Sequence, residues 1–487
     1  MATKPSGTRD TASVIDRGAS SPAEAASAPS AQPRPPAAQP TPATQPTQAT
    51  QPTQATQPTQ ATVERWRASP TPLPLVCDVQ HYAWGQRGPG AYIPAFLGAP
   101  VVADVPYAEL WIGDNRALPS RARLPGDTSA ELPLPALLAA ASDTVLSAAA
   151  RGEARLPFLT KLLAAERALS IQVHPSKQQA EAGFAEENAR GVPLGDERRS
   201  FKDANHKPEL LVALTPFWGL KGFRPLEEIA AALRDDAPEL SPLAPRLDAE
   251  LAAAGADAVA RAALLRALYT RAMRLPQAHV NALLGGLLAR LRKQPGLTAA
   301  DCRYWALRAE ADHARGTDHD RGLFSFFLLN LVRLAPGQAI FLGPGEPHAY
   351  LQGVGLEVMA NSDNVLRGGL TPKHVDIDRL LEVLVFRDGA PRLVEPVGAR
   401  AGVYETPASE FEVARVDLAG EGEFRRDGGH GADVWVVISG EARLAWDGGE
   451  LMVRRGAPVL VPAALGAYSL GCVDGEAALA FRASERV

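Results

Sequence analysis

Residues 225–314 interrupt a strand-like sequence with helical periodicity, and this interruption constrains the possible folds more than any other feature. On both sides of it, short apolar runs are bounded by Gly, Pro and Asn, as in β-strands. Within it, segments rich in Ala, Leu and Arg place apolar residues at intervals of three and four, as in packed amphipathic helices. A strand domain that continues across this stretch must therefore be discontinuous in sequence.

Four residues that could bind a metal lie on both sides of the helical stretch. Gln172 and His174 are two positions apart in an alternating apolar run, so on a strand both point to the same face. Glu209 precedes one apolar run, and His348 follows another after a Gly/Pro turn. Two imidazoles, a carboxylate and an amide oxygen suit a divalent metal such as zinc. The spacing alone leaves open whether these residues meet or are separate structural and surface residues.

Composition excludes several classes of protein. The 487 residues carry a net charge of −5, so no overall basic field attracts nucleic acid. Cys77, Cys302 and Cys472 are far apart and odd in number, which predicts a reducing compartment, the cytoplasm, without structural disulfides. No apolar stretch reaches the roughly 18 residues that span a bilayer, and residues 1–21 lack a signal-peptide core. We therefore expect neither membrane insertion nor secretion.

The pattern along the chain predicts four segments. Residues 1–68 are rich in Ala, Pro, Thr, Gln and Ser and repeat Gln-Pro-Thr-Gln-Ala-Thr three times, which predicts a disordered low-complexity tail. Residues 69–224 and 320–390 are expected to form one discontinuous catalytic domain, with a helical insert domain at 225–319. Residues 391–487 have short strands between Gly-rich turns, typical of a jelly roll that resembles half of a cupin. This last β domain is predicted to be metal-free, because no His or carboxylate stands at the turn where a cupin ligand would lie.

Five motifs stand in a fixed order along the chain. They are Leu156–Pro175 (LPFLTKLLAAERALSIQVHP), Asn205–Leu210 (NHKPEL), Ala213–Arg224 (ALTPFWGLKGFR), Pro344–Leu351 (PGEPHAYL) and Ser362–Lys373 (SDNVLRGGLTPK). Together they closely resemble the type I mannose-6-phosphate isomerases, zinc-dependent enzymes of the cupin superfamily. The resemblance implies a mainly β fold with an α insert: a cupin-type catalytic jelly roll, the helical insert and a second C-terminal jelly roll. It also implies interconversion of mannose 6-phosphate and fructose 6-phosphate through a cis-enediol, for GDP-mannose synthesis or for mannose catabolism.

The same resemblance implies roles for ten residues. One zinc ion per chain would be bound by Gln172, His174, Glu209 and His348, the four residues to which the pattern also points. The phosphosugar substrate would be bound by Lys161 and Ser170, and the catalytic residues would be Arg367, Lys207, His206 and Asp363. His206, Lys207, Asp363 and a metal-organised water all stay open as the group that moves the proton. Arg367 suits a negatively charged oxygen, with a structural ion pair to Asp363 as the alternative.

Two other functions fit parts of the sequence. A non-catalytic cupin that binds sugar phosphates is expected to have lost metal ligands, whereas all four are present. Another metal-dependent cupin enzyme, such as an iron oxygenase, commonly uses two His and one carboxylate, whereas Gln172 fits the isomerase resemblance better. The sequence therefore favours a monomeric, cytoplasmic isomerase that acts on a small phosphosugar, with neither nucleic acid nor membrane as a partner.

Overall fold

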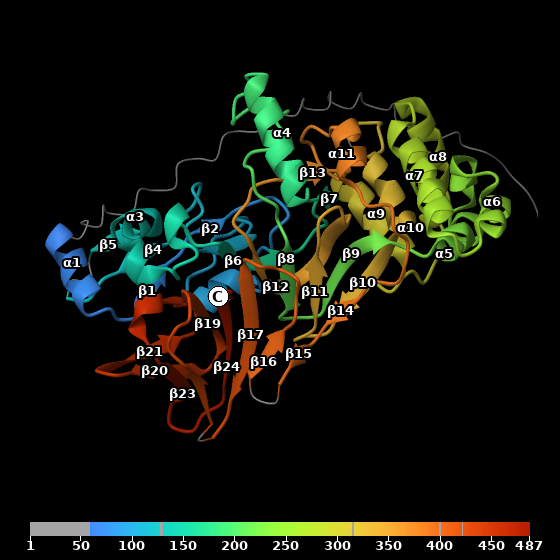
Figure 1. The fold of residues 1–487 in the computed structure, drawn as a ribbon. Coiled ribbons are helices and arrows are strands. Elements are labelled where there is room, and N and C mark those ends of the chain that lie inside the picture. Colours follow the sequence, from blue (N-terminus) through green and yellow to red (C-terminus); the bar gives the residue numbers. More distant parts are fainter. Residues whose placement is uncertain (1–58, 127–129, 314–315, 399–400, 421) are drawn as a thin grey trace, which may run out of the picture. The chain divides into compact units, whose positions relative to one another are not determined.

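Two large antiparallel sheets, a small third sheet and a group of helices make up the structure (Figure 1). The computed structural model describes residues 59–126, 130–313, 316–398, 401–420 and 422–487. From Thr59 onward the described residues form one compact unit. Most of the predicted tail, residues 1–58, lies outside the described residues. The architecture is mainly β with a helical segment between strands, as the sequence predicts.

The largest sheet, of eleven described strands, contains the strands before the helices and the strands after them. Its main path runs in the order β14-β11-β8-β12-β6-β3-β2, and β7, β9, β10 and β13 branch from it. The bounds are β2 Val79–Gln80, β3 Glu109–Ile112, β6 Phe158–Ala165, β7 Gln172–Val173, β8 Glu209–Ala213, β9 Phe217–Phe223, β10 Leu329–Leu334, β11 Ala339–Leu342, β12 His348–Ala360, β13 Leu366–Arg367 and β14 Leu393–Val394.

Strand β12 joins the two halves of this sheet because it bends. From Gly353 onward it pairs with β6 and β8, whereas its first residues pair with β7 and β9. The register shifts between Tyr350 and Gln352, and Gly353 adopts a φ of 131°. A Cβ at Gly353 would lie 2.7 Å from the Phe217 ring, so only glycine fits this bend. The bend lets both ends of β12 contribute to one jelly roll.

The second sheet combines strands from both ends of the described chain. Strand β1 pairs with β22 on one side and with β4 on the other, so the C-terminal strands continue into N-terminal ones. A third sheet has four described strands, which are interspersed along the chain with the C-terminal strands of the second sheet. The bounds are β1 Leu73–Val76, β4 Arg121–Arg123, β5 Glu131–Pro133, β15 Pro396–Val397, β16 Ala401–Tyr404, β17 Phe411–Leu418, β19 Asp433–Ser439, β22 Val459–Val461 and β24 Ala478–Glu485 for the second sheet, and β18 Glu423–Arg426, β20 Glu441–Trp446, β21 Gly449–Arg454 and β23 Tyr468–Cys472 for the third.

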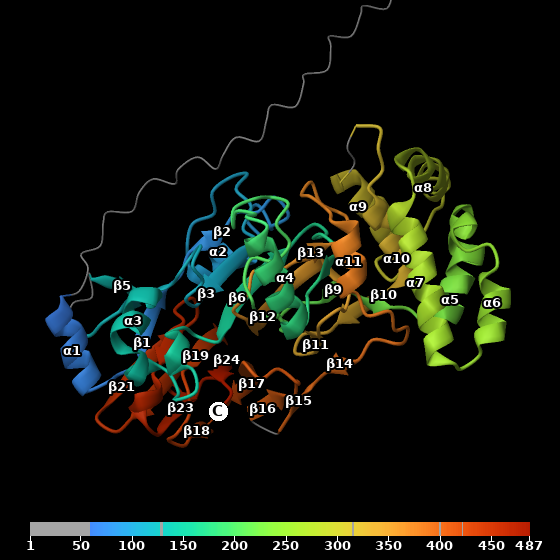
Figure 2. The same cartoon turned by 45° about the horizontal axis from the view of Figure 1, so that its top comes forward.

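Helices fill the stretch between β9 and β10, and α5 to α9 lie together in both views (Figures 1 and 2). Strands β9 and β10 are antiparallel neighbours, with Phe223 opposite Leu329, so the chain leaves and re-enters the sheet at adjacent strands. Apolar helix residues such as Leu268 and Leu287 share a core with Phe223 and Leu329. The described helices are α1 Gln60–Ala68, α2 Tyr92–Leu97, α3 Leu134–Val145, α4 Lys177–Ala189, α5 Leu226–Ala231, α6 Leu247–Ala254, α7 Ala258–Arg274, α8 Gln277–Leu291, α9 Cys302–His313, α10 Ser325–Leu328 and α11 Ile377–Val383, with short turns η1 Arg151–Glu153, η2 Ala232–Asp236, η3 Pro238–Leu243, η4 Arg321–Phe324 and η5 Ala463–Leu465.

Residues 60–68 form α1, so the predicted end of the tail at residue 68 is too late. Thr59 caps the helix by accepting a hydrogen bond from the Thr62 amide. Val63 and Trp66 are buried, and the Trp66 indole donates to the Thr71 carbonyl at 3.0 Å. The average composition of the segment predicts disorder, but Val63 and Trp66, three positions apart, lie on one face of the helix and are buried.

None of the helices in the described ranges combines the length and the apolar character needed to cross a bilayer. The division into a discontinuous catalytic domain, a helical insert and a C-terminal β domain at the stated boundaries stays a prediction.

Candidate metal centre and active site

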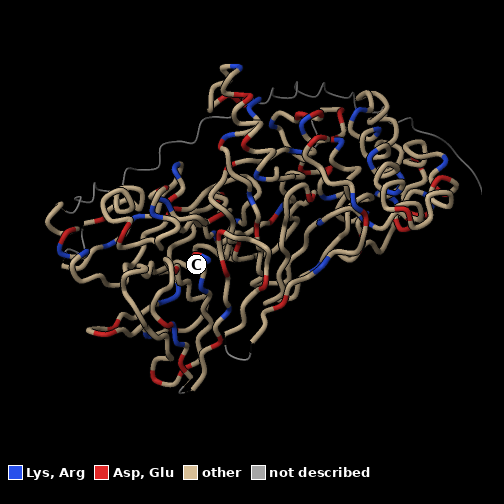
Figure 3. Tube along the Cα trace, in the orientation of Figure 1, with Lys and Arg blue, Asp and Glu red and all other residues tan. Residues whose placement is uncertain are grey.

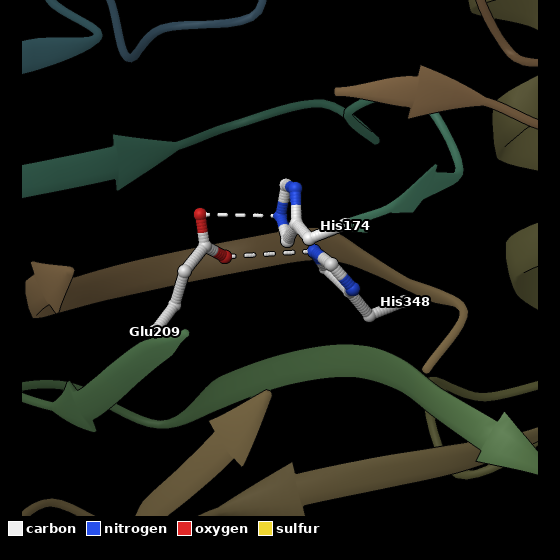
Figure 4. Close-up of side chains that lie close together, drawn as sticks. All are labelled: His174, Glu209 and His348. Carbon is white, nitrogen blue, oxygen red and sulfur yellow. Dashed lines mark ion pairs between the residues drawn. The ribbon is translucent and has the colours of Figure 1, made fainter. Parts of the chain in front are cut away.

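Three of the four predicted metal ligands meet in the interior (Figure 4). One carboxylate oxygen of Glu209 lies 3.3 Å from Nε2 of His174, and the other lies 3.5 Å from Nε2 of His348. The candidate ligand atoms of the three side chains all lie within 4.8 Å of one another. All three residues are buried. The structure therefore brings together side chains from segments that are far apart in sequence.

Strand ends position these side chains. Glu209 is the first residue of β8, His348 is the first residue of β12, and His174 directly follows β7. Gln172, the fourth predicted ligand, is half-buried on β7 and is the Cα partner of both His348 and Arg367. The register thus places Gln172 beside the two histidines, and its role as a ligand stays a prediction.

Both imidazoles are oriented through their Nδ1 atoms. Nδ1 of His174 lies 2.8 Å from the Asn364 carbonyl, and Nδ1 of His348 lies 3.0 Å from the Glu346 carbonyl. A carbonyl can only accept, so each Nδ1 carries the hydrogen and each Nε2 keeps a free lone pair. Nε2 of His174 is buried without a hydrogen-bond partner. These donors fit a divalent cation held between the two Nε2 atoms and the Glu209 carboxylate.

The electrostatics keep the donor atoms of His174 and Glu209 unprotonated. Burial lowers the pKa of His174 to about 4, so its imidazole is neutral near pH 7. Burial alone would raise the pKa of Glu209, but the positive charge of Lys207 favours the ionised carboxylate, and that pKa lies well below its usual value. Nζ of Lys207 lies 3.2 Å from Oε1 of Glu209. A neutral imidazole and an ionised carboxylate are the forms that bind a metal.

A buried group of charges lies next to Glu209, and we name Lys161, Lys207, Glu109, Glu209 and Glu357 the inner charge cluster. Nζ of Lys161 lies 3.4 Å from Glu357 and 3.8 Å from Glu109. Burial would lower the pKa of Lys161, but Glu109 and Glu357 outweigh it and raise that pKa. Burial, followed by the charge of Glu209, raises the pKa of Glu357. So many perturbed groups in one place are typical of a functional site.

Sequence reasoning missed several residues of this site. Tyr350 donates to Glu357 at 2.8 Å, and the Trp111 indole donates to Glu109 at 2.7 Å. The spacing of His348 and Tyr350, two positions apart on one strand, was a signal for Tyr350. Glu109 and Glu357 gave no comparable signal, because their partner, Lys161, is far away in sequence. Asn364, whose carbonyl orients His174, lies inside a recognised motif and was overlooked.

The remaining predicted residues have other surroundings. Among the described residues, no ion pair or hydrogen bond joins His206 or Asp363 to the three metal-binding side chains. His206 instead contacts Glu410 through Nε2, and Asp363 is exposed, with its amide donating to Asp203 at 2.8 Å. Their catalytic roles stay predictions.

Arg367 and Ser170 flank the strand that carries Gln172. Arg367 is half-buried on β13, and burial lowers its pKa. In the described part of the chain it forms no ion pair with Asp363. The alternative reading of Arg367 as the partner of Asp363 therefore receives no support. Ser170 is half-buried just before β7.

The sequence matches a known protein family and several characterised enzymes. Residues 73–226 match the family described as phosphomannose isomerase type I, catalytic domain. The mannose-6-phosphate isomerase of Salmonella typhimurium is 36% identical over 392 residues, which cover 80% of this chain and 94% of that protein. The mannose-6-phosphate isomerase of Escherichia coli is 35% identical over 398 residues, with coverages of 80% and 94%.

A crystal structure of the S. typhimurium enzyme, described as bound to its substrate, fructose 6-phosphate, and to a zinc atom, superimposes with a TM-score of 0.73. That comparison covers 85% of this chain and 100% of the other at 33% identity. Matches of this length span the strands on both sides of the helical stretch, and with them the positions of His174, Glu209 and His348. The chain therefore belongs to the type I mannose-6-phosphate isomerase family.

Proposed function

We propose that this chain interconverts mannose 6-phosphate and fructose 6-phosphate, using one zinc ion bound by His174, Glu209, His348 and Gln172. The observation that carries the proposal is the buried His-Glu-His group, whose Nε2 atoms and carboxylate point toward one another (Figure 4). Membership of the family supplies the substrate and the metal, since relatives carry the name of this enzyme and one was solved with zinc and fructose 6-phosphate. The reaction would supply mannose 6-phosphate for GDP-mannose synthesis or return mannose to catabolism.

The reaction moves one proton from C2 to C1 of the open-chain aldose and a second from the C2 hydroxyl to the carbonyl oxygen on C1, through a cis-enediol. When bound, zinc would act as a Lewis acid that stabilises negative charge on the sugar oxygens. The protein must also provide a group that takes the proton from one carbon and returns it to the next. Lys207, whose Nζ lies 3.2 Å from Glu209, is the candidate base nearest to the metal ligands, with His206 and Asp363 as the other candidates.

Substrate binding needs cations for the phosphate and the enediolate. Arg367 offers a half-buried guanidinium on β13, directly opposite Gln172 in the register. A guanidinium can donate two parallel hydrogen bonds to a phosphate or an enediolate. Ser170 and Lys161 lie before and within the strands that frame the site, and we assign both to substrate binding. Burial of Lys161 among Glu109 and Glu357 also supports a role in holding those carboxylates in place.

A coupled assay tests the proposal. Purified protein should convert mannose 6-phosphate to fructose 6-phosphate, lose the activity after treatment with a chelator and regain it on addition of zinc. Glucose 6-phosphate, which differs in configuration at C2, is the matched control and should react far more slowly. Equal rates with both sugars, or full activity in protein shown to be free of metal, would refute the proposal. A non-catalytic sugar-phosphate-binding protein would bind the substrate without turning it over.

We also propose that the enzyme acts as a monomer in the cytoplasm, without nucleic acid or membrane as a partner. The described cysteines, Cys77, Cys302 and Cys472, are all free thiols, which suits a reducing compartment. Basic and acidic segments are interspersed along the described trace (Figure 3). Size-exclusion chromatography with light scattering tests the oligomeric state, and a dimer at micromolar concentration would contradict it.

A further inference from the structure

We infer that the ion pair between Lys221 and Glu346 positions His348 for metal binding, although neither residue belongs to the ligand set. This inference rests on the proposed metal site. Nζ of Lys221 lies 2.7 Å from Oε1 of Glu346, and Lys221 is buried. The Glu346 carbonyl is the group that receives the Nδ1 hydrogen of His348 at 3.0 Å. Lys221 is also the Cα partner of His348 across β9 and β12.

Glu346, the acidic partner of Lys221, stabilises the turn of residues 343–346 that precedes His348. The second carboxylate oxygen of Glu346 accepts from the Gly343 amide at 3.3 Å, so the side chain of Glu346 folds back over its own turn. The Gly345 amide donates to the His174 carbonyl at 2.8 Å, which ties the same turn to the other histidine. The carboxylate of Glu346 therefore holds a turn that contacts both imidazole-bearing segments.

Lys221 keeps that carboxylate in place. The Glu346 side chain is 26% exposed, and it lines a cavity of about 660 Å³ together with Lys221. A carboxylate with access to such a cavity would turn toward water if its cation were removed. Without Lys221, the Glu346 carbonyl would lose its fixed direction toward Nδ1 of His348.

The contacts that run from Lys221 through Glu346 to His348 are expected to change the affinity for the metal rather than the rate of the chemical step. Partners that orient a metal-binding histidine typically change metal affinity by about 10- to 100-fold when they are removed. A purely structural ion pair would instead lower the melting temperature of the metal-free and zinc-loaded protein by equal amounts. The two roles therefore differ in the zinc dissociation constant, which does not depend on turnover.

The experiment measures zinc dissociation constants by competition with a chromophoric chelator. Lys221→Met and Glu346→Gln should each raise the constant about 10- to 100-fold, and Lys221→Arg should restore most of the affinity. Arg290→Met is the matched control, because Arg290 pairs with Glu239 at the same distance, 2.7 Å, in the helical segment away from the ligands. Its constant should equal that of the wild type. Glu346→Gln keeps the size of the side chain, so it serves if Lys221→Met does not fold.

The outcomes separate this inference from the proposed function. A wild-type protein that binds no zinc would refute the proposed metal site itself. A wild type that binds zinc, with an unchanged constant in both Lys221→Met and Glu346→Gln, would refute the positioning role alone. An equal loss in Arg290→Met would also refute it, because it would point to a general effect of lost stability.

Discussion

At the scale of single residues, the site depends on which nitrogen of each histidine is free. Nδ1 of His174 donates a hydrogen bond to the Asn364 carbonyl, and Nδ1 of His348 donates to the Glu346 carbonyl. Both residues therefore present Nε2 to the Glu209 carboxylate. The sequence named the three side chains as candidates, from strand-like runs and from the family resemblance, while spacing alone left open whether they meet. It could not name the two carbonyls, because any residue type supplies a carbonyl and only the fold decides which one lies near.

Removal of one ligand should abolish the metal site. We expect His348→Ala to lose more than about 100-fold in zinc affinity, because even partners that only orient a ligand are worth about 10- to 100-fold. Isomerase activity should fall in parallel. Metal analysis and the coupled assay measure both quantities, with the exposed His279→Ala as the control variant. Full activity in His348→Ala would remove the basis of the metal-site assignment.

The depressed pKa of His174 predicts how the metal-free protein responds to acid. The folded protein holds this pKa at about 4, compared with 6.5 for the free side chain. Between these values the unfolded chain binds more protons, so stability is fully present above pH 6.5 and falls as the pH drops toward 4. The shift corresponds to up to about 3 kcal/mol.

Urea unfolding of the metal-free wild type and of His174→Asn, at pH 7 and pH 4, measures this contribution. The wild type should lose more stability than the variant over that interval. The variant lacks the His174 imidazole but keeps all the other titrating groups. Parallel losses in the two proteins would show that His174 does not carry the effect.

At the scale of elements, hydrophobic periodicity predicted the type of several strands and helices but not their partners. The apolar runs in β6 and β8 and the three- and four-residue spacing in α7 and α8 are local properties, so they can be read from the sequence. The pairing of β1 with β22 depends on contacts between residues far apart along the chain, such as Leu73 and Leu460, for which a single sequence holds no signal. Charged residues inside strands, such as Glu357, were overlooked for the same reason.

The turn after β13 depends on a single carboxylate before η4. Oδ1 of Asp320 accepts hydrogen bonds from the amides of Gly322 and Leu370, at 2.7 and 2.8 Å. Asp320→Ala leaves both donors without this acceptor, and we expect it to cost about 1–3 kcal/mol of unfolding free energy. Since this turn follows Arg367, the KM for mannose 6-phosphate should also rise.

Urea unfolding and steady-state kinetics check both effects of Asp320→Ala. The exposed Asp318→Ala, which loses one hydrogen bond to Asn281, is the control and should change stability by less than about 0.5 kcal/mol. If the two variants behave alike, the turn does not depend on Asp320.

At the scale of the whole molecule, the two large sheets share one core. Buried residues from the predicted catalytic domain, such as Leu110 and Phe158, belong to the same apolar cluster as Val434 and Phe481 of the C-terminal strands. Such a cluster cannot be divided without exposing apolar surface from both parts. The predicted domains therefore depend on one another for stability.

Separate expression of the two parts tests this dependence. We expect fragments 59–390 and 391–487 each to fail to fold alone, and the intact chain to unfold in one calorimetric transition that shifts upward with zinc. Circular dichroism and calorimetry provide the measurements. A fragment 59–390 that folds and binds zinc as tightly as the intact chain would contradict the expectation.

The pairing of β9 with β10 has a consequence for evolution. Because Phe223 and Leu329 face each other, the loop of helices between them begins and ends about one strand spacing apart. Its length can then change without moving any metal ligand, since any segment whose two ends lie about 5 Å apart closes the same gap. Insertions and deletions among relatives should accumulate there, and a chimera that exchanges only α5–α9 for a relative's helices, and so retains Asp320, should keep its metal ligands.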